Sequence, residues 1–224
     1  MVLTAVPGRR TLALRAFQGI SSMVTIDQIR RALHGERQSP AAFEPAPSQA
    51  AVALILADGD SDLEVCFIRR AERSGDPWSG QVAFPGGRAG PGDADAPAVA
   101  ERETWEEVGL RLAAEHRVGA LPVREVTRPQ AELTLSPFVY YLGGGVQHLA
   151  SPRIADEVAD VFWVPLGHLR ADHAATELEY PIGGVPASFP GIRFGEHVIW
   201  GLTLNVLNSF FDLLSSHGAL VRDG

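Results

Sequence analysis

The sequence has a single cysteine, Cys66, among its 224 residues. One thiol cannot form a disulfide within the chain, and the apolar run around it, residues 65–68, is typical of a buried strand rather than of an activated nucleophile. The chain also lacks an uninterrupted apolar segment of the ~20 residues that a membrane span needs, because Asn205, Asn208 and Asp212 break the best candidate, 198–214. These absences predict a cytoplasmic protein with no membrane partner.

Positive charge is scarce as well, with 19 Lys and Arg residues against 27 Asp and Glu residues and a net charge of −8. A chain of this charge has no general attraction for nucleic acid, so we expect none as a partner. An anionic substrate would need a local metal ion or arginine. The 46% of hydrophobic residues are enough for one globular domain with a sizeable core.

The chain divides into three segments. Residues 1–22 contain Arg9, Arg10 and Arg15 but no acidic residue, so we expect an N-terminal extension outside the fold. This extension is either a transit peptide, which would imply an organelle, or a stretch that precedes a start at Met23. Residues 23–48 read as a short helix, Ile26 to His34, with a Pro- and Ala-rich linker, and residues 49–218 form the main domain. The oligomeric state stays open, with a homodimer as one option.

Hydrophobic periodicity predicts a mixture of strands and helices in the main domain. Strands are expected at 50–57 and 63–69, as a hairpin, and at 81–84, 118–126, 135–142 and 158–164. Helices are expected at 96–108, 166–170 and 201–217.

The helix at 96–108 is the most informative element, because Glu103, Glu106 and Glu107 share a stripe at positions i, i+3 and i+4. Like charges repel there unless a hard divalent cation draws the oxygens together. Trp105, Val108 and Ala98 fall on the side roughly opposite the acids, which predicts a helix that is anchored by its apolar side with the acids facing outward. This pattern indicates metal-assisted chemistry on a phosphate.

Two motifs, Phe84-Pro-Gly-Gly87 and Arg102-Glu-Thr-Trp-Glu-Glu-Val-Gly-Leu110, closely resemble the Nudix box of Nudix hydrolases. The resemblance implies an α/β (α+β) fold, an α/β/α sandwich around a mixed β-sheet. It also implies hydrolysis of a diphosphate bond in a nucleotide-type small molecule, with Mg²⁺ or Mn²⁺ as cofactor. Thr104 occupies a slot of the box that is usually apolar.

The first half of the box departs from the usual pattern in a way that resembles the coenzyme A diphosphatase branch. Asp93 stands where a glutamate is expected, and eight residues rather than seven separate it from Arg102. Segments 80–87, 157–166 and 199–203 also resemble that branch. An arginine that the branch usually carries upstream of the glycine-rich segment is missing at 75–78, which favours an alternative substrate such as ADP-ribose, NADH or a damaged nucleotide.

The resemblance also implies roles for individual residues. The candidates for catalysis are Glu103, Glu106, Glu107 and Arg102, and those for metal binding are the same three glutamates and Gly87. The candidates for substrate binding are Arg69, Arg70, Gly86 and Trp200, and those for supporting roles are Asp93 and Glu157. A catalytically silent Nudix fold that only binds a ligand is the rival from another class, but such domains commonly lose a box glutamate and all three are present here.

Overall fold

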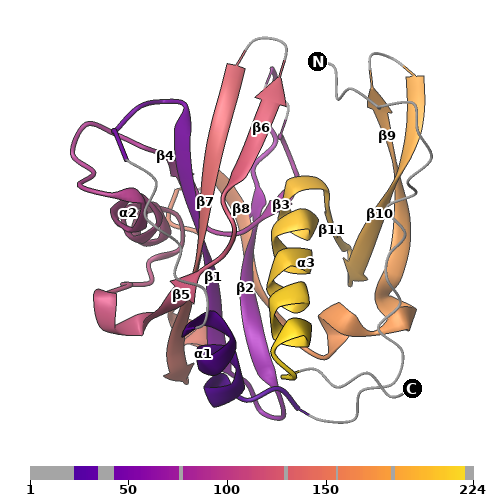
Figure 1. Cartoon of the computed structure of the whole chain (residues 1–224). Helices are drawn as coiled ribbons and strands as arrows, with labels where there is room; N and C mark the ends of the chain where they lie inside the picture. The colour runs from indigo at the N-terminus through magenta and orange to yellow at the C-terminus, as the bar shows by residue number, and fades with distance from the viewer. Residues whose placement is uncertain are drawn as a thin grey trace.

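A computed structural model describes residues 23–34, 43–75, 78–128, 131–154, 156–182 and 185–219. Three α-helices and eleven strands are placed in these ranges (Figure 1). The helices are α1 (Ile26–His34), α2 (Ala96–Val108) and α3 (Gly201–Ser216). The strands are β1 (Gln49–Asp58), β2 (Leu63–Arg70), β3 (Val82–Ala83), β4 (Gly86–Arg88), β5 (Arg117–Ala120), β6 (Arg124–Arg128), β7 (Ala131–Gly144), β8 (Val158–Pro165), β9 (Ala175–Ile182), β10 (Val185–Phe194) and β11 (His197–Trp200).

The main sheet is mixed and runs in the order β3-β2-β1-β7-β5, with β4 pairing with β1, β6 with β7, and β8 with β2. Its long central pair, β1 and β7, is parallel, whereas the other pairs are antiparallel. Strand β1 is buried along most of its length, which is what a central strand covered on both faces requires. The sheet therefore places β4, with its two glycines, directly beside the central strand.

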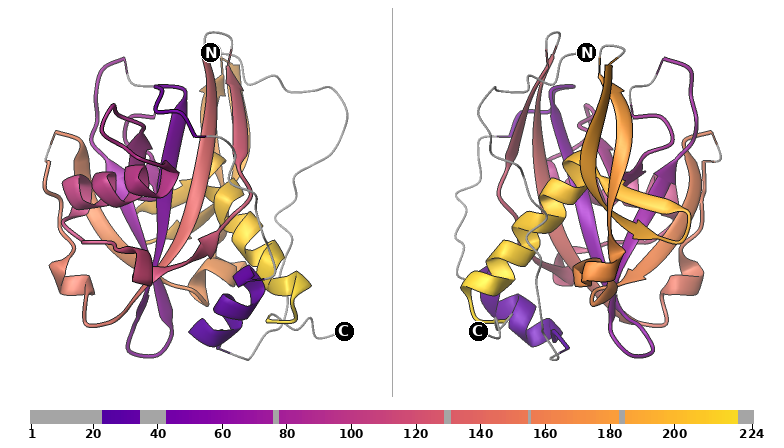
Figure 2. Two further views of the ribbon diagram at one scale, coloured as in Figure 1. Left: turned by 60° about the vertical axis from the view of Figure 1, so that its left-hand side comes forward. Right: turned by 90° about the vertical axis from the view of Figure 1, so that its right-hand side faces the viewer.

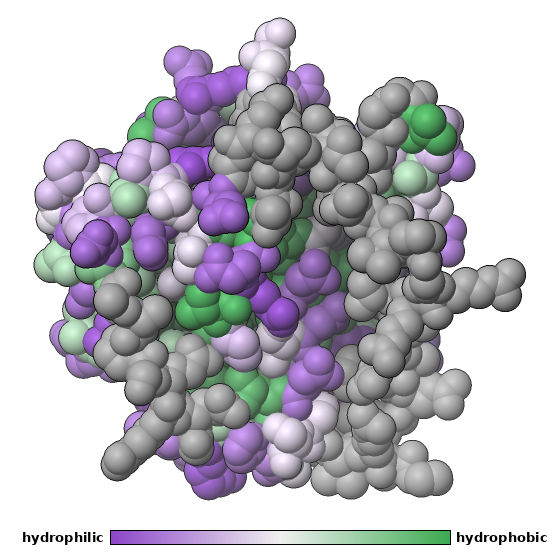
Figure 3. Space-filling model, turned by 45° about the horizontal axis from the view of Figure 1, so that its top comes forward, coloured by the Kyte–Doolittle hydropathy of each residue, from purple (hydrophilic) through white to green (hydrophobic). Residues whose placement is uncertain are grey.

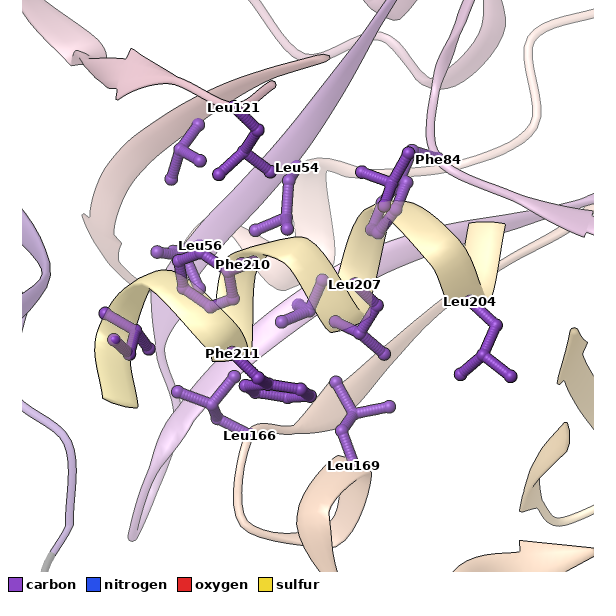
Figure 4. Close-up of a cluster of buried hydrophobic side chains, with 14 of the residues drawn as sticks. Leu54, Leu56, Phe84, Leu121, Leu166, Leu169, Leu204, Leu207, Phe210 and Phe211 are labelled. Carbon is purple, nitrogen blue, oxygen red and sulfur yellow. The ribbon is translucent and has the colours of Figure 1, made fainter. Parts of the chain in front are cut away.

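Helices cover both faces of this sheet. On one face α2 packs over a cluster that includes Ala53, Ile55 and Val99. On the other face α3 and α1 lie side by side over a larger cluster, part of which Figure 4 shows around Leu54, Phe210 and neighbouring residues (Figures 2 and 4). The α/β/α sandwich and the mixed sheet expected from the resemblance are thus confirmed, and α1 belongs to the same core as the main domain.

A second sheet, in the order β11-β10-β9, stands beside α3 (Figure 2). Sequence analysis predicted no strands between 175 and 200, so this sheet is new. Two contacts join it to the main sheet. The hydroxyl group of Thr203 in α3 donates a hydrogen bond of 2.9 Å to the carbonyl oxygen of Val82 in β3. In β11, His197 Nε2 lies 3.1 Å from Oδ2 of Asp160 in β8. Strand β3, which leads into the glycine segment, therefore lies where the two sheets meet.

Most other elements lie where they were expected, with two corrections. The predicted strand 118–126 is wrong, because it is two strands, β5 and β6, which the segment around Pro122 separates. The predicted helix 166–170 is reduced to a single 3₁₀ turn at His168–Arg170. Within the described ranges, no helix is both long and apolar enough to cross a membrane.

Candidate active site

Helix α2 has well-defined ends that fix its side chains relative to the sheet. The Asp95 carboxylate caps the first turn by accepting a hydrogen bond of 2.9 Å from the Ala98 N–H. Pro97 lies in that turn, where its missing N–H costs nothing. Gly109 ends the helix in the left-handed conformation, with φ of 77°. Both ends agree with the sequence prediction.

The three glutamates of α2 differ sharply in exposure. Glu107 is only 4% exposed, the Glu103 side chain is 18% exposed and the Glu106 side chain is 44% exposed. The expectation that all three acids face outward is therefore wrong. Glu107 is buried because it lies on the same face of the helix as Ala100 and Thr104. These three residues are related by i, i+4 and i+7, and this face packs against the sheet.

The expected apolar anchor of the helix is confirmed at Val108 and corrected at Trp105 and Ala98. Trp105 does not enter the core but lies between two guanidinium groups, with Arg111 at 3.8 Å and Arg153 at 4.0 Å from its ring centroid. Ala98 is only partly buried. Val108 is buried as expected, and the other buried residues that anchor the helix are Val99, Ala100 and Thr104.

The side chain of Glu107 is hydrogen-bonded to the backbone of strand β4. The Gly86 N–H donates a hydrogen bond of 2.9 Å to Glu107 Oε2. Burial raises the pKa of this carboxyl to about 8; the Gly86 hydrogen bond opposes the rise and the Glu103 charge adds to it. The pKa of Glu103 is also raised, chiefly by burial and against the influence of Arg102. The carboxyl groups of Glu103 and Glu107 are therefore both poorly accessible to water.

No other residue fits at Gly86, whereas a side chain at Gly87 would displace the Glu103 carboxyl group. Gly86 has φ of 148°, and a Cβ atom there would lie 2.3 Å from the Ala51 carbonyl oxygen. A Cβ atom on Gly87 would lie 2.4 Å from Glu103 Cδ. The glycine pair thus lets β4 lie against both β1 and the carboxylates of α2.

Arg102 links the loop after β4 to the helix. Its Nε and Nη2 donate hydrogen bonds of 2.9 Å to the two oxygens of Asp93, which is buried. Its Nη2 also donates to the Arg88 carbonyl oxygen at 3.1 Å, while Nη1 donates to Glu103 at 2.9 Å and to Glu106 at 3.1 Å. The hydrogen bonds from Arg102 lower the pKa of Asp93, so this pair stays ionised. One guanidinium therefore orients the loop and two of the three glutamates.

Glu157, at the turn before β8, completes the acidic side of the site. Its charge adds slightly to the raised pKa values of both Glu103 and Glu107. Arg70, at the end of β2, has the opposite effect and lowers the pKa of Glu107. The roles of Glu157 and Arg70 in the site stay predictions.

The two remaining candidates, Arg69 and Trp200, have neighbours outside this cluster. Arg69 faces Asp160 across the β2–β8 pair. Trp200 caps the start of α3 and packs against the rings of Tyr180, at 4.9 Å, and Phe189, at 5.5 Å, on the second sheet. The roles of Arg69 and Trp200 in substrate binding therefore stay predictions.

Sequence analysis missed the segment that closes the end of α2. The Arg153 N–H donates to the Glu107 carbonyl oxygen at 2.9 Å, and the Ser151 N–H donates to that of Val108 at 3.1 Å. These bonds satisfy carbonyl groups that a helix end leaves unpaired. No sequence signal points to them, because they involve backbone atoms more than 40 residues apart along the chain.

Cys66 is fully buried in β2. Burial, together with the nearby Glu107 charge, raises the pKa of its thiol. A neutral buried thiol is a poor nucleophile, which agrees with the structural role expected from the sequence.

Comparison with known proteins adds independent information. The family model described as NUDIX domain matches residues 47–182. The mitochondrial coenzyme A diphosphatase NUDT8 of Homo sapiens is 32% identical over 187 residues, which is 83% of this chain and 76% of that protein. The peroxisomal coenzyme A diphosphatase NUDT7 of Mus musculus is 39% identical over 51% of this chain and 45% of that protein. A MutT/nudix family protein from Enterococcus faecalis has a similar fold, with a TM-score of 0.55 and 16% identity over 86% of this chain and 70% of that one.

Proposed function

Because this chain belongs to the Nudix hydrolase family, we propose that it hydrolyses the diphosphate bond of coenzyme A or of an acyl-coenzyme A. The observation that carries the hydrolytic chemistry is the pair Glu103 and Glu107, two carboxyl groups confined beside a glycine strand. The choice of coenzyme A is supported by the relatives named as coenzyme A diphosphatases and by the segments 80–87, 157–166 and 199–203.

The carboxylates fit a hard divalent cation by their chemistry. Glu103, Glu107 and Glu157 offer the oxygen donors that Mg²⁺ and Mn²⁺ prefer, and they raise one another's proton affinity when no cation offsets their charge. Among the described residues, no three acidic, imidazole or thiol side chains already converge on one point, since Arg102 draws Glu103 and Glu106 to itself. When bound, the cation would neutralise the diphosphate and lower the pKa of a water molecule.

The side chains of the site divide the remaining tasks. Water attacks one phosphorus atom of the diphosphate, a new P–O bond forms, and the bond to the bridging oxygen breaks. One of the three box glutamates accepts the proton of that water, and the leaving phosphate carries away the bridging oxygen. Arg102 keeps Glu103 and Glu106 in place during this step. The carbonyl group of Gly87 is proposed as a further metal ligand.

Substrate binding is assigned to the arginines near the end of β2 and to the glycine strand. Arg70 lies near Glu107 and supplies a positive charge for phosphate oxygens. Gly86 lets the substrate approach the backbone closely. Arg69 and Trp200, whose neighbours are Asp160 on β8 and two rings of the second sheet, are proposed to contact the parts of the substrate that lie away from the diphosphate.

The decisive experiment measures cleavage of coenzyme A, acetyl-coenzyme A, ADP-ribose, NADH and diadenosine polyphosphates, with and without Mg²⁺ or Mn²⁺. We expect metal-dependent conversion of coenzyme A to phosphopantetheine and adenosine 3′,5′-bisphosphate, which mass spectrometry identifies. Preferential cleavage of ADP-ribose or NADH would replace the proposed substrate. Binding without cleavage of any compound would favour the silent, ligand-binding fold.

Two variants test the site itself. Glu103→Gln and Glu107→Gln should each lower turnover by about 100-fold or more, because a carboxylate is lost from the reacting centre. Glu115→Gln removes an exposed carboxylate in a 3₁₀ turn and is the matched control, with unchanged turnover. Unchanged turnover in both test variants would refute the assignment of the site.

Location and assembly stay predictions. The relatives named above are mitochondrial and peroxisomal by name, whereas the composition of this chain predicts the cytoplasm, or an organelle if residues 1–22 are a transit peptide. A homodimer is one option for assembly. Fractionation of the source cells and sedimentation of the purified protein would decide these two points.

A further inference from the structure

The end of helix α2 carries an exposed stack of one indole ring and two guanidinium groups. Arg111 and Arg153 lie over the ring of Trp105, with their Cζ atoms 3.8 Å and 4.0 Å from its centroid. Both arginines are exposed, and the side chain of neither forms an ion pair or a hydrogen bond with another described residue. Stacking on an indole leaves the N–H donors of a guanidinium group at the edge of the ring, where they can reach an acidic group of a partner.

The backbone fixes Arg153 in this place. Its N–H donates a hydrogen bond of 2.9 Å to the Glu107 carbonyl oxygen, and the Ser151 N–H donates one of 3.1 Å to that of Val108. The segment therefore lies against the end of α2 whatever its side chains do. Trp105, over which the guanidinium group stacks, lies outside the buried face of the helix. Arg153 is thus presented to solvent with little side-chain freedom left to lose when a partner binds.

Apolar side chains next to Arg153 are exposed as well. Ile154 is 36% exposed and Leu149 is 57% exposed. Exposed apolar side chains are ordinary in themselves, and hydrophobic ones also lie among hydrophilic ones on the face that Figure 3 shows. Here, however, they adjoin tryptophan and arginine, the residue types that are enriched at the centres of protein interfaces. The surface formed by Trp105, Arg111, Leu149, Arg153 and Ile154 is called the tryptophan–arginine surface below.

Asp156 supplies the opposite charge three residues after Arg153. It is exposed, and its carboxylate has no ion pair or hydrogen bond with another described residue. The N–H groups of Glu157 and Val158 both donate to the Ile154 carbonyl oxygen, at 2.8 Å and 2.9 Å, which keeps Asp156 in a tight turn beside Ile154. An exposed apolar residue is therefore flanked by a cation and an anion. Such a surface is complementary to itself, because a two-fold axis brings each charge of one copy opposite the other charge of the second copy.

We propose that the tryptophan–arginine surface binds a second copy of this chain in a two-fold symmetric dimer. Ile154 of the two copies lies near the axis, and Arg153 of each copy pairs with Asp156 of the other. The stack on Trp105 holds the arginine ready for this pair. With a net charge of −8 the two copies repel each other at long range, so a contact between them is favoured where guanidinium groups are exposed. The inference does not depend on the proposed hydrolysis.

Charge reversal with complementation tests the pairing. Sedimentation equilibrium from about 1 µM to about 500 µM, at low salt so that exposed charges are not screened, measures the association. We expect the wild type to form dimers in this range. Arg153→Glu and Asp156→Arg should each weaken the association by at least about tenfold, because like charges then face each other. An equimolar mixture of these two variants should dimerise about as well as the wild type, because each copy supplies the charge that the other lacks. Recovery in the mixture also shows that both variants are folded.

Two further variants complete the experiment. Trp105→Ala, which keeps both charges but removes the stack, should weaken the association by at least about fivefold, whereas Trp105→Phe, which keeps a ring face, should lose less. The matched control is Arg30→Glu on α1, where the exposed arginine pairs with Asp27 at 3.4 Å, and it should associate as the wild type does. A wild type that stays monomeric, or a mixture that stays as weak as its components, would overturn the proposal. Failure to cleave coenzyme A, with dimers formed as expected, would remove only the proposed function.

Discussion

Replacing Glu107 by glutamine should stabilise the metal-free protein while it inactivates the enzyme. Folding raises the pKa of Glu107 from 4.5 to about 8, so the folded state holds this proton more tightly than the unfolded chain does. The associated stabilisation is fully present below about pH 4.5 and is lost as the pH rises through about 8. Glutamine stays neutral at every pH, and its side-chain oxygen can still accept the Gly86 N–H bond.

The size of the effect follows from the pKa shift. Each pKa unit corresponds to about 1.4 kcal/mol, so the advantage of Glu107→Gln should grow from below about 1 kcal/mol at pH 5 to about 4 kcal/mol at pH 8. Because Glu107 is almost fully buried, solvent does not screen this difference. For a domain of this size, the variant should melt roughly 10 °C above the wild type at pH 8.

Thermal or urea unfolding between pH 5 and pH 8, in the presence of a chelator, measures this difference. Added Mg²⁺ should stabilise the wild type much more than the variant and so reduce or reverse the gap, because the cation binds the folded carboxylates. Glu115→Gln, at an exposed carboxylate, should show no such pH-dependent advantage. If Glu107→Gln were no more stable than the wild type at pH 8 without metal, the burial and raised pKa assigned to this residue would be wrong.

Three further substitutions probe the surroundings of the site. Gly87→Ala should lower kcat by about 100-fold, because its Cβ atom displaces the carboxyl group that lies against it, whereas Gly92→Ala, with open space around it, should keep full activity in the same assay. Asp93→Asn should lose about 1–3 kcal/mol in urea unfolding through its weakened bonds to Arg102. Since folding lowers the pKa of Asp93, this deficit should persist from pH 8 down to about pH 5 and shrink below about pH 4; a deficit that stayed constant at pH 3 would contradict the ion pair. Thr104→Val should raise the melting temperature by about 2–4 °C, because the buried hydroxyl has no hydrogen-bond partner among the described residues, and a lower melting temperature would show that the hydroxyl is satisfied.

The sequence was most informative where the residues of one element determine both its secondary structure and the positions of its ends. The helix α2 could be predicted with its caps, because Asp95, Pro97 and Gly109 are local signals that need no knowledge of the rest of the chain. The hairpin of β1 and β2 was equally accessible, since a continuous apolar run meets a turn rich in Asp and Gly.

The second sheet shows the opposite case. Strands β9 and β10 contain Pro181, Pro186 and Pro190, and proline normally argues against a strand because it donates no backbone hydrogen bond. The structure nevertheless pairs Pro186 with Pro181 and Pro190 with Glu177. Here the pairing of two long antiparallel segments outweighs local preference, which sequence periodicity cannot reveal.

The sequence indicated candidate residues for the site but not how they are arranged in space. Spacing on a helix brings Glu103, Glu106 and Glu107 to one stripe, but it does not say which of them is buried. The burial of each glutamate depends on strand β4, which pairs with β1 and hydrogen-bonds to Glu107. These contacts form only when segments distant in the sequence meet.

The loop between β4 and α2 shows how the chain departs from the family pattern without losing its central contact. An aspartate is one methylene shorter than the usual glutamate, and the intervening chain is one residue longer. The backbone of the loop turns at Gly90, where the Asp93 N–H donates to the Gly90 carbonyl oxygen and the Gly90 N–H donates to Asp93 Oδ2. This turn fixes Asp93 beside the Arg102 guanidinium, so that both carboxylate oxygens accept hydrogen bonds from it. The extra residue in the loop therefore compensates for the shorter side chain of Asp93. Arg102 still donates hydrogen bonds to Glu103 and Glu106.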